Sequence, residues 1–382
     1  MSIDLTPRWQ DEELSMFRDS IGRFLESELV PRDEEARKQG NVGHDMWRKA
    51  GEIGLLCTDI PEQYGGAGGD YRHEAVVAEE MGKRGLTGLN HSVHSIVAHY
   101  LLNHGTDEQK DEYLPRMARG ELVGAIAMTE PGTGSDLQGV RTHAKKDGDQ
   151  YVINGSKTFI SNGYLAGLVL VVAKTDTTQG AKGMSIMIVE TEDQPGYQVG
   201  RVLDKIGLKA QDTSELFFED VRVHEDRLLG GVEGKGFFQL MGDLPYERLF
   251  IGIGAMAAME GAYNATLDYV RERTAFGQPI AEFQNTKFKL AEIATTLKVA
   301  RAFMDECVED MVAGKLDTNK ASMAKLWGSE NQCRVIDECL QLFGGYGYMN
   351  EYLIGRMYTD ARIQRIYGGT SEIMKEVISR AL

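Results

Sequence analysis

The sequence predicts an α+β fold with three consecutive parts: an N-terminal helical domain (residues 1–122), a middle β-barrel-like domain (residues 123–230) and a C-terminal four-helix bundle (residues 231–382). Two observations support this expectation. At 382 residues the chain is too long for one compact core, because single cores stop growing at about 250–300 residues. The spacing of apolar residues also changes twice, from helical to strand-like near Val123 and back to helical near Gly236.

The N-terminal part is expected to be mainly helical. Apolar side chains recur at three- and four-residue steps over residues 11–30, and this pattern meets Pro31, which is typical of an amphipathic helix and its end. Similar helical patterns occur in residues 73–83, 90–103 and 107–118.

The middle part consists of short β-rich runs separated by Gly, Asn, Asp and Pro. We expect strands within residues 123–128, 151–153, 168–172, 185–189 and 216–223. The pair Asn154-Gly155 predicts a hairpin turn, because both residue types accept the positive φ angles that tight hairpins need.

The C-terminal part predicts long helices from Gly236 onward, with only Pro245 and Pro279 as breaks. Residues 252–257, Gly-Ile-Gly-Ala-Met-Ala, match the GxGxxA form of a dinucleotide fingerprint. They lie in a helical pattern with no preceding strand, so close helix packing through small residues explains them better.

Composition excludes several classes of function. The formal net charge of -16 argues against a nucleic-acid or anionic-membrane partner, since both need clustered Lys and Arg. No apolar run approaches the roughly 20 residues of a membrane helix, and the N-terminus has neither signal nor transit character. Four sparse cysteines without CxxC spacing indicate a reducing compartment. A soluble, cytoplasmic protein without disulfides is expected.

A metal site is not expected. His91 and His94 are three residues apart on a predicted helix and could share a face, but His99 turns away from His94. No carboxylate or cysteine lies in the same turn to complete a set of ligands.

Two segments indicate a binding site for a flat polar ring. Residues 127–136, Ala-Met-Thr-Glu-Pro-Gly-Thr-Gly-Ser-Asp, follow a predicted strand and offer backbone amides and hydroxyls in a glycine-permitted loop. Residues 157–163 supply an aromatic face and a further hydroxyl. Together with residues 273–279, 341–347 and 365–375, these segments resemble the acyl-CoA dehydrogenase family. The resemblance covers nearly the whole chain in the family's order and spacing.

The resemblance implies FAD as cofactor. The loop from Ile126 to Ser135 would line the flavin, with Thr129 bonding the ring and Ser135 near the substrate, and Phe159 would stand where many members carry tryptophan. Contacts with the flavin half of the cofactor are therefore expected from Ile126, Met128, Thr129, Gly134, Ser135, Phe159, Ile160 and Ser161, and contacts from the C-terminal segment are expected from Thr370 and Glu372.

In this family the dinucleotide half of FAD crosses a subunit boundary, so the resemblance also implies a homo-oligomer, usually a tetramer. Arg273 would meet the pyrophosphate of the neighbouring chain's FAD, since a guanidinium suits paired phosphate oxygens. The alternative for Arg273 is an exposed surface charge. Around the adenosine end we expect Phe276, Gln284, Gln341, Gly344 and Gly345.

The catalytic base is the main departure from many relatives. They carry glutamate directly after the tyrosine of the last segment, whereas here Tyr367 is followed by Gly368. Glu247, in the segment that is expected to open the first helix of the bundle, resembles the helix-borne glutamate of the long-chain and isovaleryl members, and we assign it as the base. The rival interpretation makes Glu247 a surface partner of Arg248 or Arg271. Glu372 is the other nearby carboxylate.

The implied reaction is α,β-dehydrogenation of a medium- to long-chain or branched acyl-CoA to the trans-2-enoyl-CoA. Glu247 would remove the α proton, the β carbon would deliver hydride to flavin N5, and electrons would pass to an electron-transferring flavoprotein. Substrate contacts are expected from Ser135, Tyr246, Arg248, Gly368 and Gly369, with a purely structural role as the alternative for Arg248. An acyl-CoA oxidase and a flavin-binding scaffold without turnover remain the alternative functions.

Overall fold

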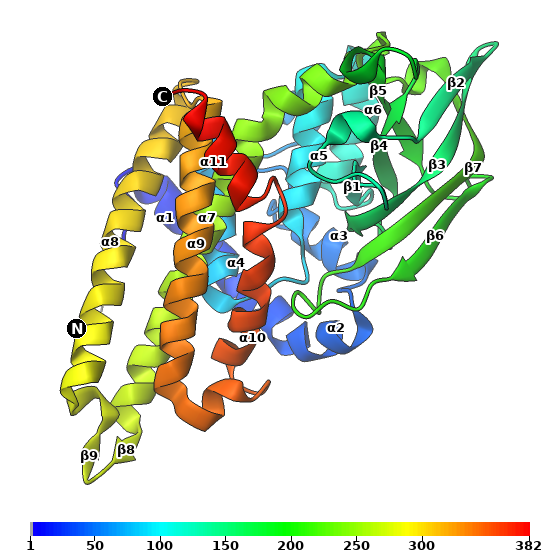
Figure 1. Cartoon of the computed structure of the whole chain (residues 1–382). Coiled ribbons are helices and arrows are strands. Elements are labelled where there is room, and N and C mark those ends of the chain that lie inside the picture. The colour runs from blue at the N-terminus through cyan, green and yellow to red at the C-terminus, as the bar shows by residue number, and fades with distance from the viewer. Residues whose placement is uncertain (1–2) are drawn as a thin grey trace.

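The N-terminal part of the computed structural model, which describes residues 3–382, is a layer of helices (Figure 1). Asp11 accepts a hydrogen bond from the backbone N–H of Leu14, and Asp70 and Thr106 each form a capping box. All four predicted helical segments are confirmed, and the first continues through a π turn and a 3-10 turn to Arg32. The helices of this part are α1 (Glu12–Phe24), α2 (Asp33–Gln39), α3 (His44–Glu52), α4 (Tyr71–Arg84), α5 (His91–His104) and α6 (Asp107–Ala118).

The middle part is a curled sheet of seven strands. Strands β1 and β4 pair in parallel, β5 pairs antiparallel with β4, and β2, β3, β7 and β6 follow in an antiparallel run. The expectations for β1, β3, β4, β5 and β7 are confirmed; β2 and β6 are additional. The strands are β1 (Gly124–Ala127), β2 (His143–Asp147), β3 (Gln150–Ser161), β4 (Leu168–Lys174), β5 (Met184–Glu190), β6 (Tyr197–Val202) and β7 (Thr213–His224).

The predicted hairpin at Asn154-Gly155 is wrong. β3 continues through this pair, and its register against β7 shifts between Ile153 and Gly155, as in a β-bulge. Gly155 has a φ of +153°, and a Cβ there would lie 2.3 Å from Thr142 Oγ1, so the bulge needs glycine as much as a turn would. The turn between β2 and β3 instead contains Gly148, with a φ of +65°.

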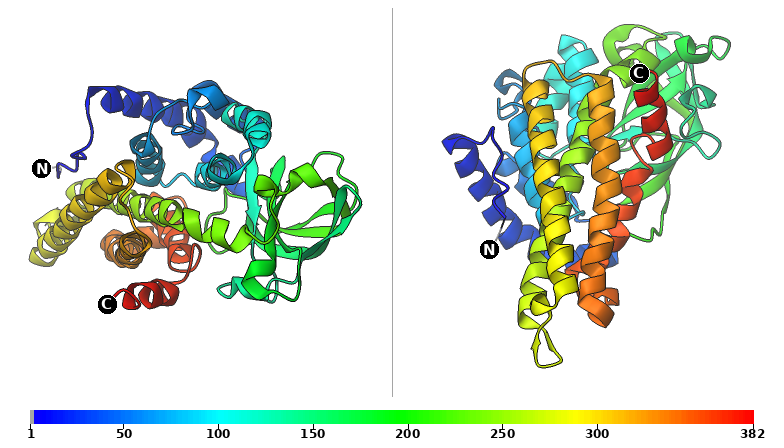
Figure 2. Two further views of the ribbon diagram at one scale, coloured as in Figure 1. Left: turned by 90° about the horizontal axis from the view of Figure 1, so that it is seen from above. Right: turned by 60° about the vertical axis from the view of Figure 1, so that its left-hand side comes forward.

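The C-terminal part consists of three long helices, with the shorter α10 and α11 packed on α9. A small hairpin joins α7 to α8 and projects from one end of the bundle (Figures 1 and 2). Its helices are α7 (Gly236–Glu272), α8 (Gln284–Val312), α9 (Thr318–Phe343), α10 (Leu353–Ala361) and α11 (Ser371–Ser379), and the hairpin strands are β8 (Thr274–Ala275) and β9 (Gln278–Pro279).

The predicted break at Pro245 is also wrong, because Pro245 lies inside α7. Proline removes one backbone hydrogen bond from a helix interior, but the buried face of α7 packs along both α4 and α9, and this packing outweighs the local cost. The helix begins at Gly236, as expected, but continues without a break through Pro245, so Glu247 lies about three turns inside it and not in its first turn.

The GxGxxA segment serves helix packing, as expected. A Cβ at Gly252 would lie 3.1 Å from the carbonyl oxygen of Ala324, and a Cβ at Gly328 would lie 3.2 Å from the Cα of Gly252. Helices α7 and α9 therefore approach backbone to backbone. Within residues 3–382, no helix is both long and apolar enough to cross a membrane.

Candidate active site

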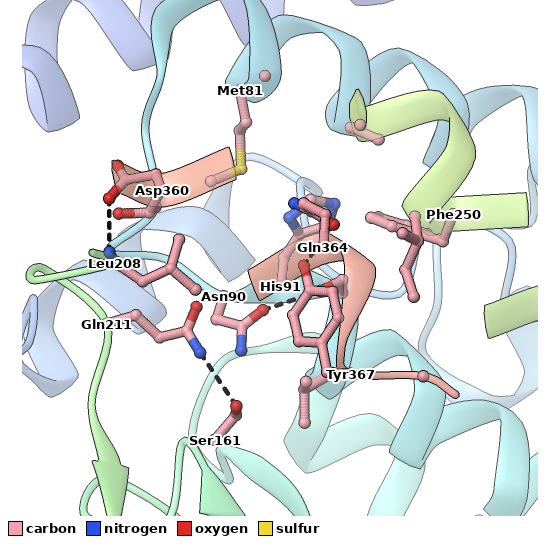
Figure 3. Close-up of a pocket in the computed structure, with 18 of the residues that line it drawn as sticks. Met81, Asn90, His91, Ser161, Leu208, Gln211, Phe250, Asp360, Gln364 and Tyr367 are labelled. Atoms are coloured by element: carbon pink, nitrogen blue, oxygen red, sulfur yellow. Dashed lines mark hydrogen bonds between the residues drawn. The ribbon is translucent and has the colours of Figure 1, made fainter. Parts of the chain in front are cut away.

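A cavity of about 320 Å³ lies where the three parts of the chain meet. Helices α4 and α5 form one wall, α7 and the tail after α10 form another, and the ends of β1 and β3 close the third. Figure 3 shows part of the lining, including Met81, Phe250 and Leu208 as apolar contacts and Tyr367 bonded to Gln364 at 2.7 Å. Small residues of α4 and α7 also line the cavity, namely Ala78, Gly82, Gly254 and Ala258.

Glu247 of α7 lines this cavity and is only 8% exposed. The hydroxyl of Tyr100 on α5 donates to Glu247 Oε1 at 2.9 Å. Burial raises the pKa of Glu247 to about 7, whereas the bond from Tyr100 opposes that rise. The rival interpretation of Glu247 as a surface ion-pair partner is wrong, because its carboxylate is buried and Arg248 bonds Ser322 Oγ at 3.0 Å instead.

A second contact between the same two helices lies one turn away. His104 Nε2 is 2.8 Å from Asp243 Oδ2, and Asn103 donates to Asp243 Oδ1 at 2.6 Å. Tyr100 and His104 are four residues apart on α5, as Glu247 and Asp243 are on α7. The two helices are therefore joined by two polar contacts in series.

The sheet brings the two predicted loops together. The cavity is lined by six of the residues expected at the flavin: Ile126, Met128, Thr129, Phe159, Ile160 and Ser161. Thr158 N donates to the Thr129 carbonyl at 2.9 Å, which ties one loop to β3. Phe159 is 67% exposed, with a φ of +60°, so its ring face is available to a ligand. Ser161 Oγ accepts a hydrogen bond from Gln211 (Figure 3).

A buried ion pair supports this wall. Lys157 Nζ lies 2.9 Å from Glu130 Oε1 and also donates to the Met128 carbonyl at 3.1 Å. The Glu130 carboxylate accepts hydrogen bonds from the backbone N–H groups of Arg141 and Thr142, so it connects both ends of the loop. Burial lowers the pKa of Lys157 to about 8.

The tail passes the cavity with two glycines in left-handed conformations. Gly368, with a φ of +61°, lines the cavity, and a Cβ there would lie 2.5 Å from Ile251 Cδ1. Gly369 has a φ of +92°, and its carbonyl accepts a hydrogen bond from the buried Lys325 Nζ. No side chain can follow Tyr367 here without displacing Ile251.

Several predicted site residues lie outside the cavity. Gly134 and Ser135 are exposed on the loop after β1, and the side chains of Tyr246 and Arg248 are buried elsewhere. Gly369 is next to the lining residue Gly368 but is not itself part of the wall. The remaining two belong to α11: Thr370 caps this helix, accepting from Ile373 N at 3.2 Å, and Glu372 is exposed.

The residues expected around the dinucleotide half gather at the bundle end that carries the β8–β9 hairpin (Figure 1). Arg273 follows α7, and its guanidinium lies 5.6 Å from the centre of the Tyr346 ring. Phe276 in the hairpin is 98% exposed with a φ of +51°. Exposed positions near these two are Gln284, Gln341, Gly344 and Gly345.

The histidines near the cavity have contacts within the fold. His94 Nδ1 accepts from Gly124 N at 3.1 Å, and His99 lies 3.0 Å from Asp59 while packing on the Tyr246 ring. His91 packs on Phe250 in the cavity wall.

Sequence reasoning missed two features of the site. Tyr100 is 147 residues from Glu247 along the chain, and no local pattern connects the two. Lys157 and Glu130 both belong to the two segments that indicated a ligand, but their pairing becomes visible only when β3 is placed beside the loop after β1.

Comparisons with known proteins agree with this arrangement. Three family models match in order: acyl-CoA dehydrogenase N-terminal domain (residues 11–121), middle domain (residues 125–221) and C-terminal domain (residues 234–382). The long-chain specific acyl-CoA dehydrogenase, mitochondrial, of Sus scrofa is 50% identical over 373 residues, covering 97% of this chain and 86% of the relative.

Solved structures are similarly close. An acyl-CoA dehydrogenase from Geobacillus kaustophilus superposes with a TM-score of 0.95 at 46% identity, covering 98% of this chain and 99% of that one. A chain described as the electron transferring flavoprotein of Acidaminococcus fermentans superposes with a TM-score of 0.94 at 36% sequence identity, and the match covers 98% of this chain and 99% of that chain. A glutaryl-CoA dehydrogenase from Mycobacterium smegmatis in complex with FADH2 superposes with a TM-score of 0.91 at 28% sequence identity, and the match covers 98% of this chain and 95% of that chain.

Proposed function

Because this chain belongs to the acyl-CoA dehydrogenase family, we propose that it forms a trans double bond between the α and β carbons of an acyl-CoA, with Glu247 as the base. The observation that carries the proposal is a buried carboxylate in the cavity wall that α7 shares with the tail, where this chain has glycine and many members have glutamate. Burial raises the pKa of Glu247 to about 7, and a base is most effective when its pKa lies near the working pH.

FAD is the cofactor that the cavity suits. The exposed ring of Phe159, the hydroxyl-bearing Thr129 and the apolar Ile126 and Met128 form one wall, and Gly368 places no side chain opposite them. Bound FAD would supply the acceptor for the hydride that leaves the β carbon.

The protein groups would do the remaining work. Glu247 takes the α proton, and the negative charge that develops on the thioester oxygen needs hydrogen-bond donors already in place. We assign this role to the backbone N–H groups of Gly368 and Gly369. They directly follow Tyr367, whose own N–H donates to the carbonyl of Ile363 and ends the preceding turn. Lys325 holds the Gly369 carbonyl and thereby fixes the orientation of this segment.

We also propose that the dinucleotide half of FAD is shared between subunits of a homo-oligomer, a tetramer by analogy with the family. The residues at the hairpin end of the bundle support this, since they include the Arg273 guanidinium, which can bind phosphate, and the almost fully exposed ring of Phe276. The same set includes the bare glycine backbone at Gly344 and Gly345, which a ligand could approach closely.

The substrate class and partner follow from the relatives. The substrate would be a medium- to long-chain or branched acyl-CoA, and the long-chain specific relative at 50% identity supports the long-chain end of this range. The likeness to a chain described as an electron transferring flavoprotein supports that kind of acceptor. A reducing, cytoplasmic location remains part of the proposal, supported by four free cysteines.

The alternatives are an acyl-CoA oxidase and a flavin-binding scaffold without turnover. Purified protein would be mixed anaerobically with straight, branched and aromatic acyl-CoAs while flavin absorbance is followed. We expect rapid bleaching by at least one acyl-CoA and slow reoxidation in air. If no acyl-CoA bleaches the flavin, the result would favour the scaffold. Rapid reoxidation of the bleached flavin by air would favour the oxidase.

The same assay tests the base. Glu247→Gln should keep its bound flavin but lose at least roughly a hundredfold in the rate of bleaching, within the usual contribution of a general base. Glu372→Gln is the matched control, an exposed carboxylate in the tail for which we expect no such loss. Near-normal bleaching by Glu247→Gln would refute the assignment.

A further inference from the structure

The hydroxyl of Tyr100 forms a hydrogen bond with one of the two carboxylate oxygens of Glu247. It donates to Oε1 at 2.9 Å, and the Tyr100 side chain is 0% exposed. Its ring belongs to a buried apolar cluster that also includes residues of the sheet and Leu240 of α7, so close packing restricts its rotation. Glu247 lines the cavity, and within residues 3–382 no hydrogen bond reaches its Oε2, so Oε2 is the oxygen available to a bound ligand.

The second contact between α5 and α7 fixes this geometry. His104 and Asn103 both bond the carboxylate of Asp243, one helical turn from Tyr100 and Glu247. Two successive polar contacts set the relative height of the two helices, so the Tyr100 hydroxyl is held opposite Glu247 by more than its own bond.

Charged groups around Glu247 act in different directions. The nearby Asp243 carboxylate disfavours the ionised form, and Arg248 on the same helix favours it. On α9, the Lys325 ammonium is directed to the Gly369 carbonyl, and on α5 the buried His91 packs against Phe250. Tyr100 is the group that donates a hydrogen bond to the carboxylate itself. Burial beside carboxylates raises the pKa of Tyr100, so it remains a neutral donor.

We propose that Tyr100 is a positioning residue that holds Oε1 of Glu247 and thereby presents Oε2 to the α carbon of the substrate. This inference rests on the proposed function. The α C–H bond breaks, its proton forms a bond to Oε2, and its electron pair stays with the substrate as the enolate. Tyr100 keeps its own proton and donates to Oε1 before and after the transfer.

The test compares Tyr100→Phe with wild type by the rate of flavin reduction in the holoenzyme, using saturating dodecanoyl-CoA from pH 6 to pH 10. Loss of the donor destabilises the ionised carboxylate, so the midpoint of the pH profile should rise by about one unit. The rate at pH 7 should fall roughly fivefold, because the ionised fraction of the carboxyl falls from about one half to about one tenth, and it should recover at high pH. A profile that keeps the wild-type midpoint, whether or not the rate falls uniformly, would overturn the inference.

Tyr71→Phe is the matched control. Tyr71 on α4 is also buried, and its hydroxyl donates to the carbonyl of Tyr246, the residue before Glu247, at 3.4 Å. This variant removes a buried hydroxyl against the same helix without touching the carboxylate, and it should keep the wild-type midpoint. A midpoint shift in Tyr71→Phe as large as that in Tyr100→Phe would show a general packing effect and count against a specific role.

A second variant keeps the inference testable if Tyr100→Phe does not retain flavin. Incorporation of 3-fluorotyrosine at position 100 preserves the ring and hydroxyl but makes a stronger donor, so the midpoint should move to lower pH. An infrared difference titration of the holoenzyme without substrate, with Glu247→Gln identifying the carboxyl band, reads the same shift without turnover. An unchanged band titration in both Tyr100 variants would refute the inference. If Glu247→Gln itself reduces flavin normally, the proposed function fails instead.

Discussion

Replacing Glu247 with glutamine should stabilise the protein at alkaline pH although it removes the proposed base. Burial raises the pKa of this carboxyl from 4.5 to about 7. The difference of about 2.5 units, at roughly 1.4 kcal/mol per unit, corresponds to an upper limit of roughly 3 kcal/mol for the cost of burying the ionised group. Glutamine can accept the Tyr100 hydrogen bond without that cost.

The sign of the pH dependence follows from the two protonation states. Below pH 4.5 the carboxyl is protonated in both the folded and unfolded chain, and it costs nothing. Between pH 4.5 and about 7 the unfolded chain releases this proton while the folded chain retains it, so wild-type stability falls as pH rises through this window. Above about pH 7 the loss is complete.

The assay is the melting temperature of both proteins at pH 5 and pH 8, at equal protein and FAD concentrations, because ligand and assembly both shift melting. Glu247→Gln should gain more at pH 8 than at pH 5. The exposed Glu372→Gln should show no such gain. Equal differences between variant and wild type at the two pH values would refute the reasoning, because they would mean that the carboxyl has no raised pKa in the folded protein.

Three further predictions concern the walls of the cavity and the hairpin end. Lys157→Met leaves the buried Glu130 carboxylate without its cation, so unfolding should become easier by roughly 3 kcal/mol and flavin should be lost on gel filtration. Gly368→Ala should destabilise the tail by roughly 1–2 kcal/mol and slow flavin reduction, because its φ is +61° and the new Cβ meets Ile251; adding Ile251→Ala should recover part of the rate. Arg273→Ala should weaken flavin retention and assembly, read by sedimentation, while far-UV circular dichroism stays unchanged.

Each of these has a contradicting result. Full flavin content in Lys157→Met would show that the ion pair does not support the loop. A wild-type rate in Gly368→Ala would mean that the tail tolerates a side chain beside Ile251. Unchanged flavin content and sedimentation in Arg273→Ala would remove the support for a cofactor shared at this end of the bundle.

Local signals predicted most elements of the fold. Helices α4 and α6 have strong periodicity and capping residues such as Asp70 and Thr106, so their ranges could be predicted closely. Two local signals misled for physical reasons. Glycine at 155 serves a bulge rather than a turn, because either conformation needs the missing Cβ. Pro245 is tolerated within α7 because packing along the helix outweighs one lost hydrogen bond.

The candidate site was predictable where its residues are close in sequence. Thr129 in the loop after β1 and Phe159 near the end of β3 belong to segments whose composition indicated a ligand, and both line the cavity. The partner of Glu247 was not predictable, because Tyr100 is part of an ordinary buried helix face and its contact spans 147 residues. Ser135 was assigned from the motif, but the loop carries it to the surface.

The most direct test of the account is exchange of the α proton of an acyl-CoA with solvent deuterium, measured by mass spectrometry on the holoenzyme. A β-blocked acyl-CoA, which can lose the α proton but not the hydride, isolates the step assigned to Glu247. We predict rapid exchange in wild type and in Glu372→Gln, and exchange at least roughly a hundredfold slower in Glu247→Gln with binding retained. Undiminished exchange in Glu247→Gln, or its loss in Glu372→Gln, would contradict it.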